Sequence, residues 1–240
     1  MKPALSLALR ASAATVVAVG LGLAAWWGWE AVAAQPVTQV RFLGEVGRVS
    51  AADLERLASG LRGRPANSVP LGELRDAVRA MAWVRDATVR RHYPGTLEVT
   101  LDVHEPLARW DAERLVSVVG EVFAAEFDEP MPRFVGPEGA APAMVARWAR
   151  LQAVAAPLGS PVAELRLNAR GAWQVRLASG LSIDLGRSDM EARLARFAHA
   201  WPRVADSAAK ATHVDLRYPN GFAVRGAVPE KSPPARPRRA

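Results

Sequence analysis

An uncharged stretch near the N-terminus most constrains what this chain can fold into. Residues 11–29 read ASAATVVAVGLGLAAWWGW, 19 residues without a charged side chain. As an α-helix rising about 1.5 Å per residue, the stretch would be about 28 Å long, close to the ~30 Å hydrocarbon core of a bilayer. The sequence therefore predicts one transmembrane helix at residues 11–29, and no later run is as long and apolar.

The charges that flank this stretch predict its orientation. Lys2 and Arg10 precede it, and Glu30 follows it. Because cationic residues tend to stay on the cytoplasmic side, residues 1–10 are expected to be a short cytoplasmic segment, with the rest of the chain exported. Three tryptophans between residues 26 and 29 lie at the exit end, where indole rings favour the headgroup layer.

A cleavable signal peptide is the competing interpretation. Ala31, Val32 and Ala33 form an A-x-A pattern after a basic start and an apolar run. An anchor is favoured because the run is longer than the usual apolar region of about 7–15 residues, and because bulky tryptophans precede the cleavage site. Both interpretations place residues 35–240 across the membrane.

The first exported block, residues 37–105, has the pattern β-α-α-β-β. Ser50 is a good N-cap with Asp53 three residues later, and leucines at helical spacing follow. In the last strand, apolar residues from Leu97 to Val103 alternate with polar ones, as expected for a half-buried strand. The predicted elements are strand 37–46, helix 50–61, helix 70–81, strand 84–93 and strand 96–105.

The second block, residues 107–227, is richer in strands and contains two predicted helices. Asn220 and Gly221 favour the tight turn of a final hairpin. The predicted elements are strand 115–123 with a glycine turn or bulge at Gly120, helix 141–158, strands 164–168, 172–178 and 181–185, a helix beginning after Ser188, and strands 213–218 and 222–225. Residues 230–240 are rich in proline and arginine and have no large apolar side chain, which predicts a disordered basic tail at residues 228–240.

The composition of the chain and the spacing of its histidines argue against a catalytic or metal-binding role. The sequence contains no cysteine, which excludes thiol nucleophiles and disulfides, and its four histidines lack the spacing of a zinc site. No nucleophile or nucleotide-binding motif is present. We therefore expect no enzyme, no cofactor, no metal and no small-molecule substrate. The excess of 31 Lys and Arg over 24 Asp and Glu is concentrated partly at the termini, and it does not predict nucleic-acid binding.

The order of these parts and several short motifs resemble the FtsQ family of bacterial cell-division proteins. The motifs are AWVRDATVRR at residues 82–91 followed by Tyr93-Pro94, EPLARW at residues 105–110, and VDLRYPNGFAV at residues 214–224. The resemblance implies an α+β fold in which residues 37–105 form a POTRA-like domain. It also implies that residues 107–227 form a mixed or antiparallel β domain with two helices.

The resemblance implies an assembly protein of the divisome in the cell inner membrane. Its expected topology is single-pass, with a cytoplasmic N-terminus and periplasmic domains at the division septum. The expected partners are FtsB- and FtsL-like bitopic proteins, with other divisome proteins at the POTRA-like domain. The family's FtsB site, on the last strand of the β domain, carries over to Arg217, Tyr218, Asn220 and, more weakly, Phe222.

Other interpretations remain open from the residues alone. POTRA modules also occur in envelope transport and assembly factors, so such a factor is the main alternative. A periplasmic protein released by cleavage after Ala33, and an envelope enzyme of unknown type, are further alternatives. Tyr218 and Asn220 also fit a purely structural role in the hairpin turn.

Overall fold

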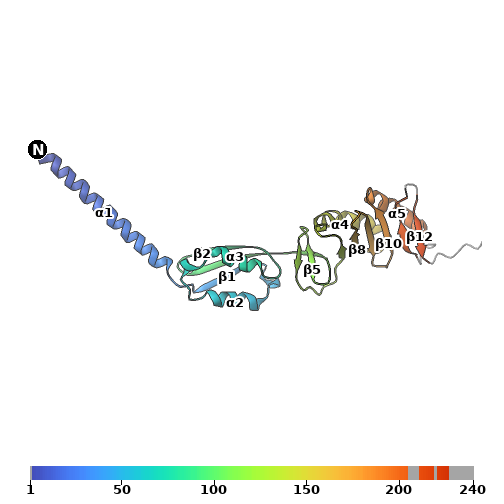
Figure 1. The fold of residues 1–240 in the computed structure, drawn as a ribbon, viewed down its shortest axis with the longest axis horizontal. Coiled ribbons are helices and arrows are strands. Elements are labelled where there is room, and N and C mark those ends of the chain that lie inside the picture. The colour runs from blue at the N-terminus through green and yellow to red at the C-terminus, as the bar shows by residue number, and fades with distance from the viewer. Residues whose placement is uncertain (1, 205–210, 219–220, 227–240) are drawn as a thin grey trace, which may run out of the picture. The chain divides into compact units, whose positions relative to one another are not determined.

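The structure, a computed structural model, describes the backbone of residues 2–204, 211–218 and 221–226 (Figure 1). Side chains are described in the same ranges, except those of residues 2–15 and 33. The chain divides into two compact units, residues 1–104 and 105–240. The predicted basic tail, residues 228–240, lies outside the described residues.

The first helix, α1 (Lys2–Ala33), includes the whole uncharged stretch. It begins well before residue 11, so most of the predicted cytoplasmic segment is helical too. The side chains of residues 16–32 are exposed. Within the part of the chain whose side chains the structure describes, no helix combines the length and the apolar character needed to cross a membrane.

The rest of the first unit has the predicted order β-α-α-β-β. Ser50 caps the first of these helices, and its hydroxyl accepts a hydrogen bond from the Asp53 N–H at 3.3 Å. The elements are β1 (Gln39–Gly44), α2 (Ala51–Leu61), α3 (Leu71–Arg79), β2 (Val84–His92) and β3 (Thr96–Val103), with short 3-10 turns at Val46–Arg48 and Ala66–Ser68.

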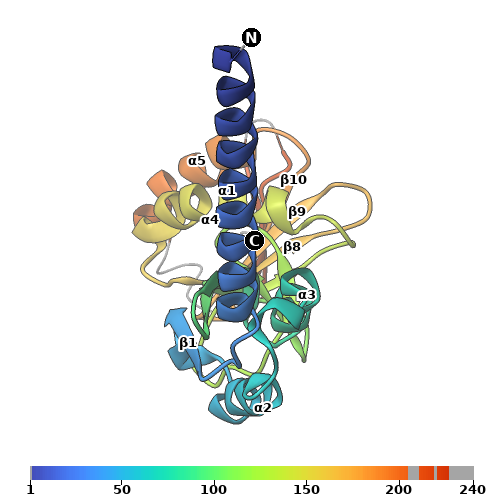
Figure 2. The same ribbon diagram turned by 90° about the vertical axis from the view of Figure 1, so that its left-hand side faces the viewer.

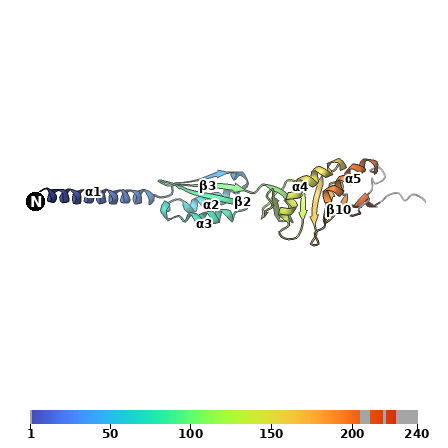
Figure 3. The same ribbon diagram turned by 90° about the horizontal axis from the view of Figure 1, so that it is seen from above.

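These strands form a sheet in the order β1-β3-β2, with α2 and α3 on one face (Figure 3). β1 runs parallel to β3, and β2 runs antiparallel to it. The core between sheet and helices includes Leu54, Val78, Leu97 and Val99, and contains no described side chain of α1. At the end of β1, Gly44 has φ +90°, and a Cβ there would run into the carbonyl oxygen of Leu101.

The second unit contains one sheet and two main helices, consistent with the expected α+β class. Residues 115–123 form a short hairpin, and its turn lies at Gly120, where a glycine turn or bulge is predicted and where φ is +87°. The elements are β4 (Pro106–Arg109), β5 (Arg114–Ser117), β6 (Val122–Ala124), β7 (Arg133–Val135), α4 (Ala141–Ala155), a 3-10 turn (Ala156–Leu158), β8 (Val162–Leu167), β9 (Trp173–Leu177), β10 (Ser182–Gly186), α5 (Met190–Val204), β11 (Ala211–Asp215) and β12 (Ala223–Gly226).

The sheet of the second unit has the order β12-β11-β10-β9-β8-β7-β4-β5-β6. α4 connects the parallel neighbours β7 and β8, and α5 connects the parallel neighbours β10 and β11. Connections of this kind are right-handed, so both helices lie on the same face of the sheet, side by side (Figure 2). The strands at the two edges are β12 and β6.

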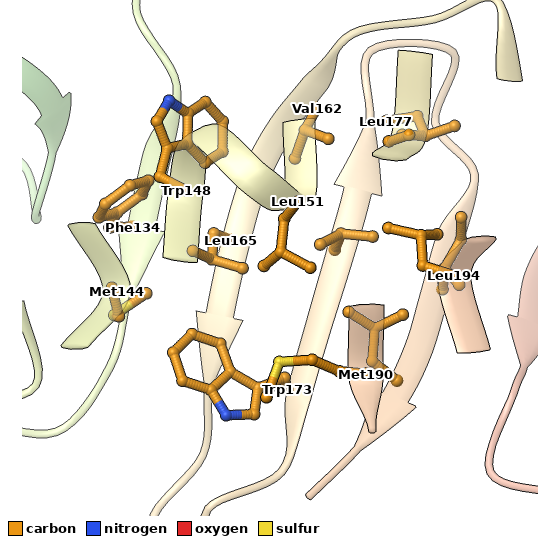
Figure 4. Packing of buried hydrophobic residues seen from close by; sticks show 14 of the residues in the cluster. Phe134, Met144, Trp148, Leu151, Val162, Leu165, Trp173, Leu177, Met190 and Leu194 are labelled. Atoms are coloured by element: carbon orange, nitrogen blue, oxygen red, sulfur yellow. The ribbon is translucent and has the colours of Figure 1, made fainter. Parts of the chain in front are cut away.

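Large apolar side chains fill the space between this sheet and its helices (Figure 4). Phe134 and Leu165 from the sheet and Leu151 and Leu194 from the helices are fully buried. The rings of Phe134 and Trp148 meet edge to face, with centroids 5.2 Å apart. Among the described residues, this core and that of the first unit share no side chain.

Candidate partner-binding site

Arg217 lies in the connection between β11 and β12 rather than in a strand. The sequence predicts a strand up to residue 218, but β11 ends at Asp215. The cause is local, because the Asp215 carboxylate accepts a hydrogen bond from the backbone N–H of Arg217 at 3.0 Å. Such a bond two residues along the chain forms a turn that ends a strand.

The guanidinium of Arg217 is held by the same carboxylate. Nε donates to Asp215 Oδ1 at 2.9 Å, and Nη2 donates to Oδ2 at 2.6 Å. The Arg217 side chain is 61% exposed, whereas that of Asp215 is 13% exposed. The hydrogen bonds from Arg217 lower the pKa of Asp215, against the opposing effect of burial, and they raise the pKa of Arg217. Arg217 is therefore a fixed, accessible cation.

β10, the strand beside this connection, leaves room for the Arg217 side chain at Gly186. Gly186, the last residue of β10, has φ +83°, and a Cβ there would lie 3.3 Å from Arg217 Cγ and 2.5 Å from Arg193 Nη1. Only glycine leaves both arginines in place. Next to Arg217 is a shallow hollow of about 130 Å³, which Arg166, Asn168, Gln174 and Asp184 also line.

The sheet surface beside the hollow is polar and internally paired. Asp184 accepts a hydrogen bond from Gln174 Nε2 at 2.8 Å, and its other oxygen lies 3.2 Å from His213 Nε2. Arg166 pairs with Glu164 at 2.7 Å. The polar groups of this surface are therefore engaged with one another.

The other three predicted site residues differ in their surroundings. Tyr218 is 54% exposed, which is unusual for a large aromatic ring and leaves it available for contact. Asn220 lies outside the described residues. Phe222 packs on the core, with its ring centroid 5.1 Å from that of Phe197, so it anchors the start of β12. The structure thus brings Arg217 and Tyr218 together on the surface and packs the ring of Phe222 against the core.

β12 follows these residues and forms one edge of the sheet. Its one neighbour among the described strands is β11, with Val214 opposite Val224. An edge strand presents backbone N–H and C=O groups that another chain can pair with. β12 is thus a sheet edge that begins a few residues after Arg217 and Tyr218.

Sequence reasoning predicted a site at Arg217 but did not include Asp215, which holds the Arg217 side chain in place. The available signal was the Asp-x-Arg spacing, since a carboxylate two residues before an arginine can hold both its backbone and its guanidinium. Gly186 and Arg193 had no comparable signal, because only the parallel pairing of β10 with β11 brings them near Arg217. Among the described residues, no group of three or more His, Asp or Glu side chains could hold a metal ion.

Each of the two units of this chain matches the model of a known domain family. The model of the FtsQ-type POTRA domain matches residues 35–102, and that of the C-terminal region of cell division protein FtsQ/DivIB matches residues 108–217. Similar proteins include the cell division protein FtsQ of Bordetella pertussis, which is 35% identical over 90% of this chain and 89% of its own length.

FtsQ of Xanthomonas campestris pv. campestris is 33% identical over 88% of this chain and 80% of its own length. FtsQ of Burkholderia pseudomallei is 43% identical over 67% of each chain. The chain belongs to the FtsQ family of cell division proteins.

Proposed function

We propose that this protein is a non-catalytic divisome assembly protein that binds FtsB- and FtsL-like partners in the periplasm. The contact is made by Arg217, Tyr218 and Asn220, with a lesser part for Phe222. In this role the protein links early and late division proteins. Membership of the FtsQ family supports the place in cell division.

The observation that carries the proposal is a fixed, accessible arginine in the connection that leads from β11 into the edge strand β12. Asp215 fixes the Arg217 guanidinium through Nε and Nη2, while Nη1 makes no hydrogen bond with a described residue. The exposed ring of Tyr218 supplies rigid contact area next to it. An extended partner segment carrying a carboxylate fits this arrangement.

The proposal includes an anchor in the cell inner membrane at the division septum. Residues 11–29 carry no charge and lie within α1, with Lys2 and Arg10 before them. This charge pattern favours a single pass with the N-terminus in the cytoplasm and both later units in the periplasm. The POTRA domain would then hold other divisome proteins.

The experiment is a pull-down of the full chain, purified in detergent, with the exported segments of the host's FtsB- and FtsL-like proteins. Arg217→Gln removes the positive charge without placing a new carboxylate beside Asp215, and we expect it to weaken binding about tenfold or more. Tyr218→Ala is expected to weaken it similarly. Circular dichroism confirms that each variant is folded.

Arg150→Glu is the matched control. Arg150 is an exposed arginine on α4 in the same unit, so its reversal changes net charge without touching the proposed site. We expect the Arg150→Glu variant to bind as the wild type does. Failure of the folded wild type to bind either segment would refute the proposed partners, and equal loss in Arg150→Glu and Arg217→Gln would refute the proposed site.

A further inference from the structure

Helix α1 joins the POTRA domain without an intervening linker. Past the last residue of α1, the N–H of Ala34 still donates to the Glu30 carbonyl at 2.9 Å. The N–H of Gln35 donates to the Val32 carbonyl at 3.3 Å. The Gln35 carbonyl in turn accepts the N–H of Ala66, in the domain, at 2.9 Å. The end of the helix and the start of the domain are therefore one continuous hydrogen-bonded piece of backbone.

The turn between β2 and β3 lies at this same end of the domain. The N–H of Thr38, just before β1, donates to the carbonyl of Gly95 in that turn at 2.9 Å. In the same segment, Pro36 forms a β-bridge with Pro65. We call the end of the domain next to α1 the helix-proximal end, and it consists of residues 34–38, 63–67 and 93–95.

An aromatic contact connects the helix-proximal end to α1. The rings of Trp29 and Tyr93 meet edge to face, with centroids 5.1 Å apart. Tyr93 remains 36% exposed, and Trp26 and Trp27 are exposed on α1. Tyrosine and tryptophan rings have an apolar body and a polar tip, so they are enriched in the headgroup layer of bilayers. The aromatic residues gathered here are therefore those of a membrane interface.

The spacing along the chain places this end at the membrane surface. In the proposed anchor, residues 11–29 cross the hydrocarbon core, so Trp29 lies at its outer edge. Gln35 is six residues farther on, which at about 1.5 Å per residue is about 9 Å. The headgroup layer on each side of a bilayer is about 5–7 Å thick. Gln35 and its partner Ala66 would thus lie just beyond that layer, within reach of a long side chain.

Arg64 is an available cation at the helix-proximal end. It is exposed, and its side chain makes no hydrogen bond or ion pair with a described residue. By contrast, Arg62 pairs with Glu55 at 2.7 Å. Arg91 Nη2 donates to the Val69 carbonyl, also at 2.7 Å. A guanidinium such as that of Arg64 can bind a lipid phosphate through two N–H groups at once.

We propose that the helix-proximal end of the POTRA domain docks on the periplasmic surface of the membrane. Tyr93 enters the headgroup layer, and Arg64 binds the phosphate of an anionic phospholipid. The inference rests on the proposed membrane anchor and adds a lipid contact to it. Because no linker separates α1 from the domain, this contact would restrict the directions in which the domain can leave the membrane.

The test relies on the absence of cysteine from the sequence, which lets one introduced cysteine carry a fluorophore. Asn67→Cys places the label on an exposed turn of the helix-proximal end. Ala52→Cys is the matched position, also exposed, on α2. Since α2 ends at Leu61, beside residues 63–67, Ala52 lies about 14 Å away along the helix axis.

The full chain is reconstituted in vesicles of phosphatidylcholine, with or without phosphatidylglycerol. A membrane-impermeant maleimide then labels only those chains whose POTRA domain faces outward. A small share of lipid with a nitroxide on its headgroup quenches nearby fluorophores, and fluorescence lifetimes separate docked from undocked chains. We expect strong quenching at residue 67 and weaker quenching at residue 52.

Four variants assign the contact to its residues. Arg64→Gln should lower the ratio of docked to undocked chains about fivefold in vesicles with phosphatidylglycerol, the effect of one arginine near an anionic surface. Glu30→Gln, which removes a carboxylate from the same layer, should raise that ratio. Arg79→Gln is the matched control, because Arg79 lies beside Asp86 at the other end of the domain, and it should change nothing. Tyr93→Ala should reduce quenching in both kinds of vesicle.

Absence of quenching at residue 67 in an anchored chain would overturn the inference and leave this end of the domain to a protein partner. Equal quenching at residues 52 and 67, or equal effects of Arg64→Gln and Arg79→Gln, would overturn it too. Thermal unfolding of the first unit verifies that each variant is folded. A chain that does not float with the vesicles in a density gradient loses the proposed anchor and the inference together. A chain that floats but shows no quenching loses the inference alone.

Discussion

The two separate cores predict that each unit of this protein unfolds on its own. Phe134 is completely buried in the second unit and packs edge to face on Trp148. Truncating such a phenylalanine to alanine typically costs about 3–5 kcal/mol. None of that cost should reach the first unit, because among the described residues the two cores share no side chain.

The size of the effect follows from the length of the unit. For a domain of somewhat over 100 residues, 1 kcal/mol lowers Tm by about 3–4 °C. Phe134→Ala is thus expected to lower the Tm of the second unit by about 10–20 °C. Scanning calorimetry of the full chain measures both transitions, and amide exchange resolved along the sequence assigns each to its unit.

Leu97→Ala is the reciprocal variant, since Leu97 is completely buried in the first unit. It should lower only the transition of the first unit, at a cost of about 2–5 kcal/mol. A single transition that moves in both variants would refute the reasoning, because it would mean that the units stabilise each other.

Two further predictions concern single residues. Because Arg217 lowers the pKa of Asp215, the pair stabilises the second unit above about pH 4, and this stability is lost as pH falls through the folded pKa. Urea unfolding of Asp215→Asn should therefore vary less with acid pH than that of the wild type. Gly44→Ala should destabilise the first unit by at least about 1 kcal/mol more than Gly63→Ala in the same assay. Both glycines have positive φ, but only at Gly44 would the added Cβ meet a backbone carbonyl, that of Leu101.

Local sequence patterns predicted a helix or strand well where the residues of that segment alone determine its structure. The cap at Ser50 and the alternation from Leu97 to Val103 depend on neighbouring residues, and both are seen. The helix predicted over residues 141–158 is seen as α4 and the 3-10 turn that follows it. These signals act within about one turn or one strand.

The neighbours within the large sheet could not be predicted from the same signals. β4 lies beside β7, and β7 beside β8, although long connections separate them in the sequence. Alternation along a strand shows which face is buried, but it does not show which strand lies alongside. The end of β11 was predicted wrongly for a different, local reason, because the Arg217 N–H donates a hydrogen bond to the Asp215 carboxylate and turns the chain there.

The parallel pairing of β1 with β3 has a mechanical consequence. β1 is the first strand of its unit and β3 is the last, so a pull on the two ends of the unit draws these neighbours in opposite directions along their length. All six registered pairs, from Gln39–Thr96 to Gly44–Leu101, then carry the load together instead of opening one after another. The first unit is thereby built to transmit tension along the chain without coming apart.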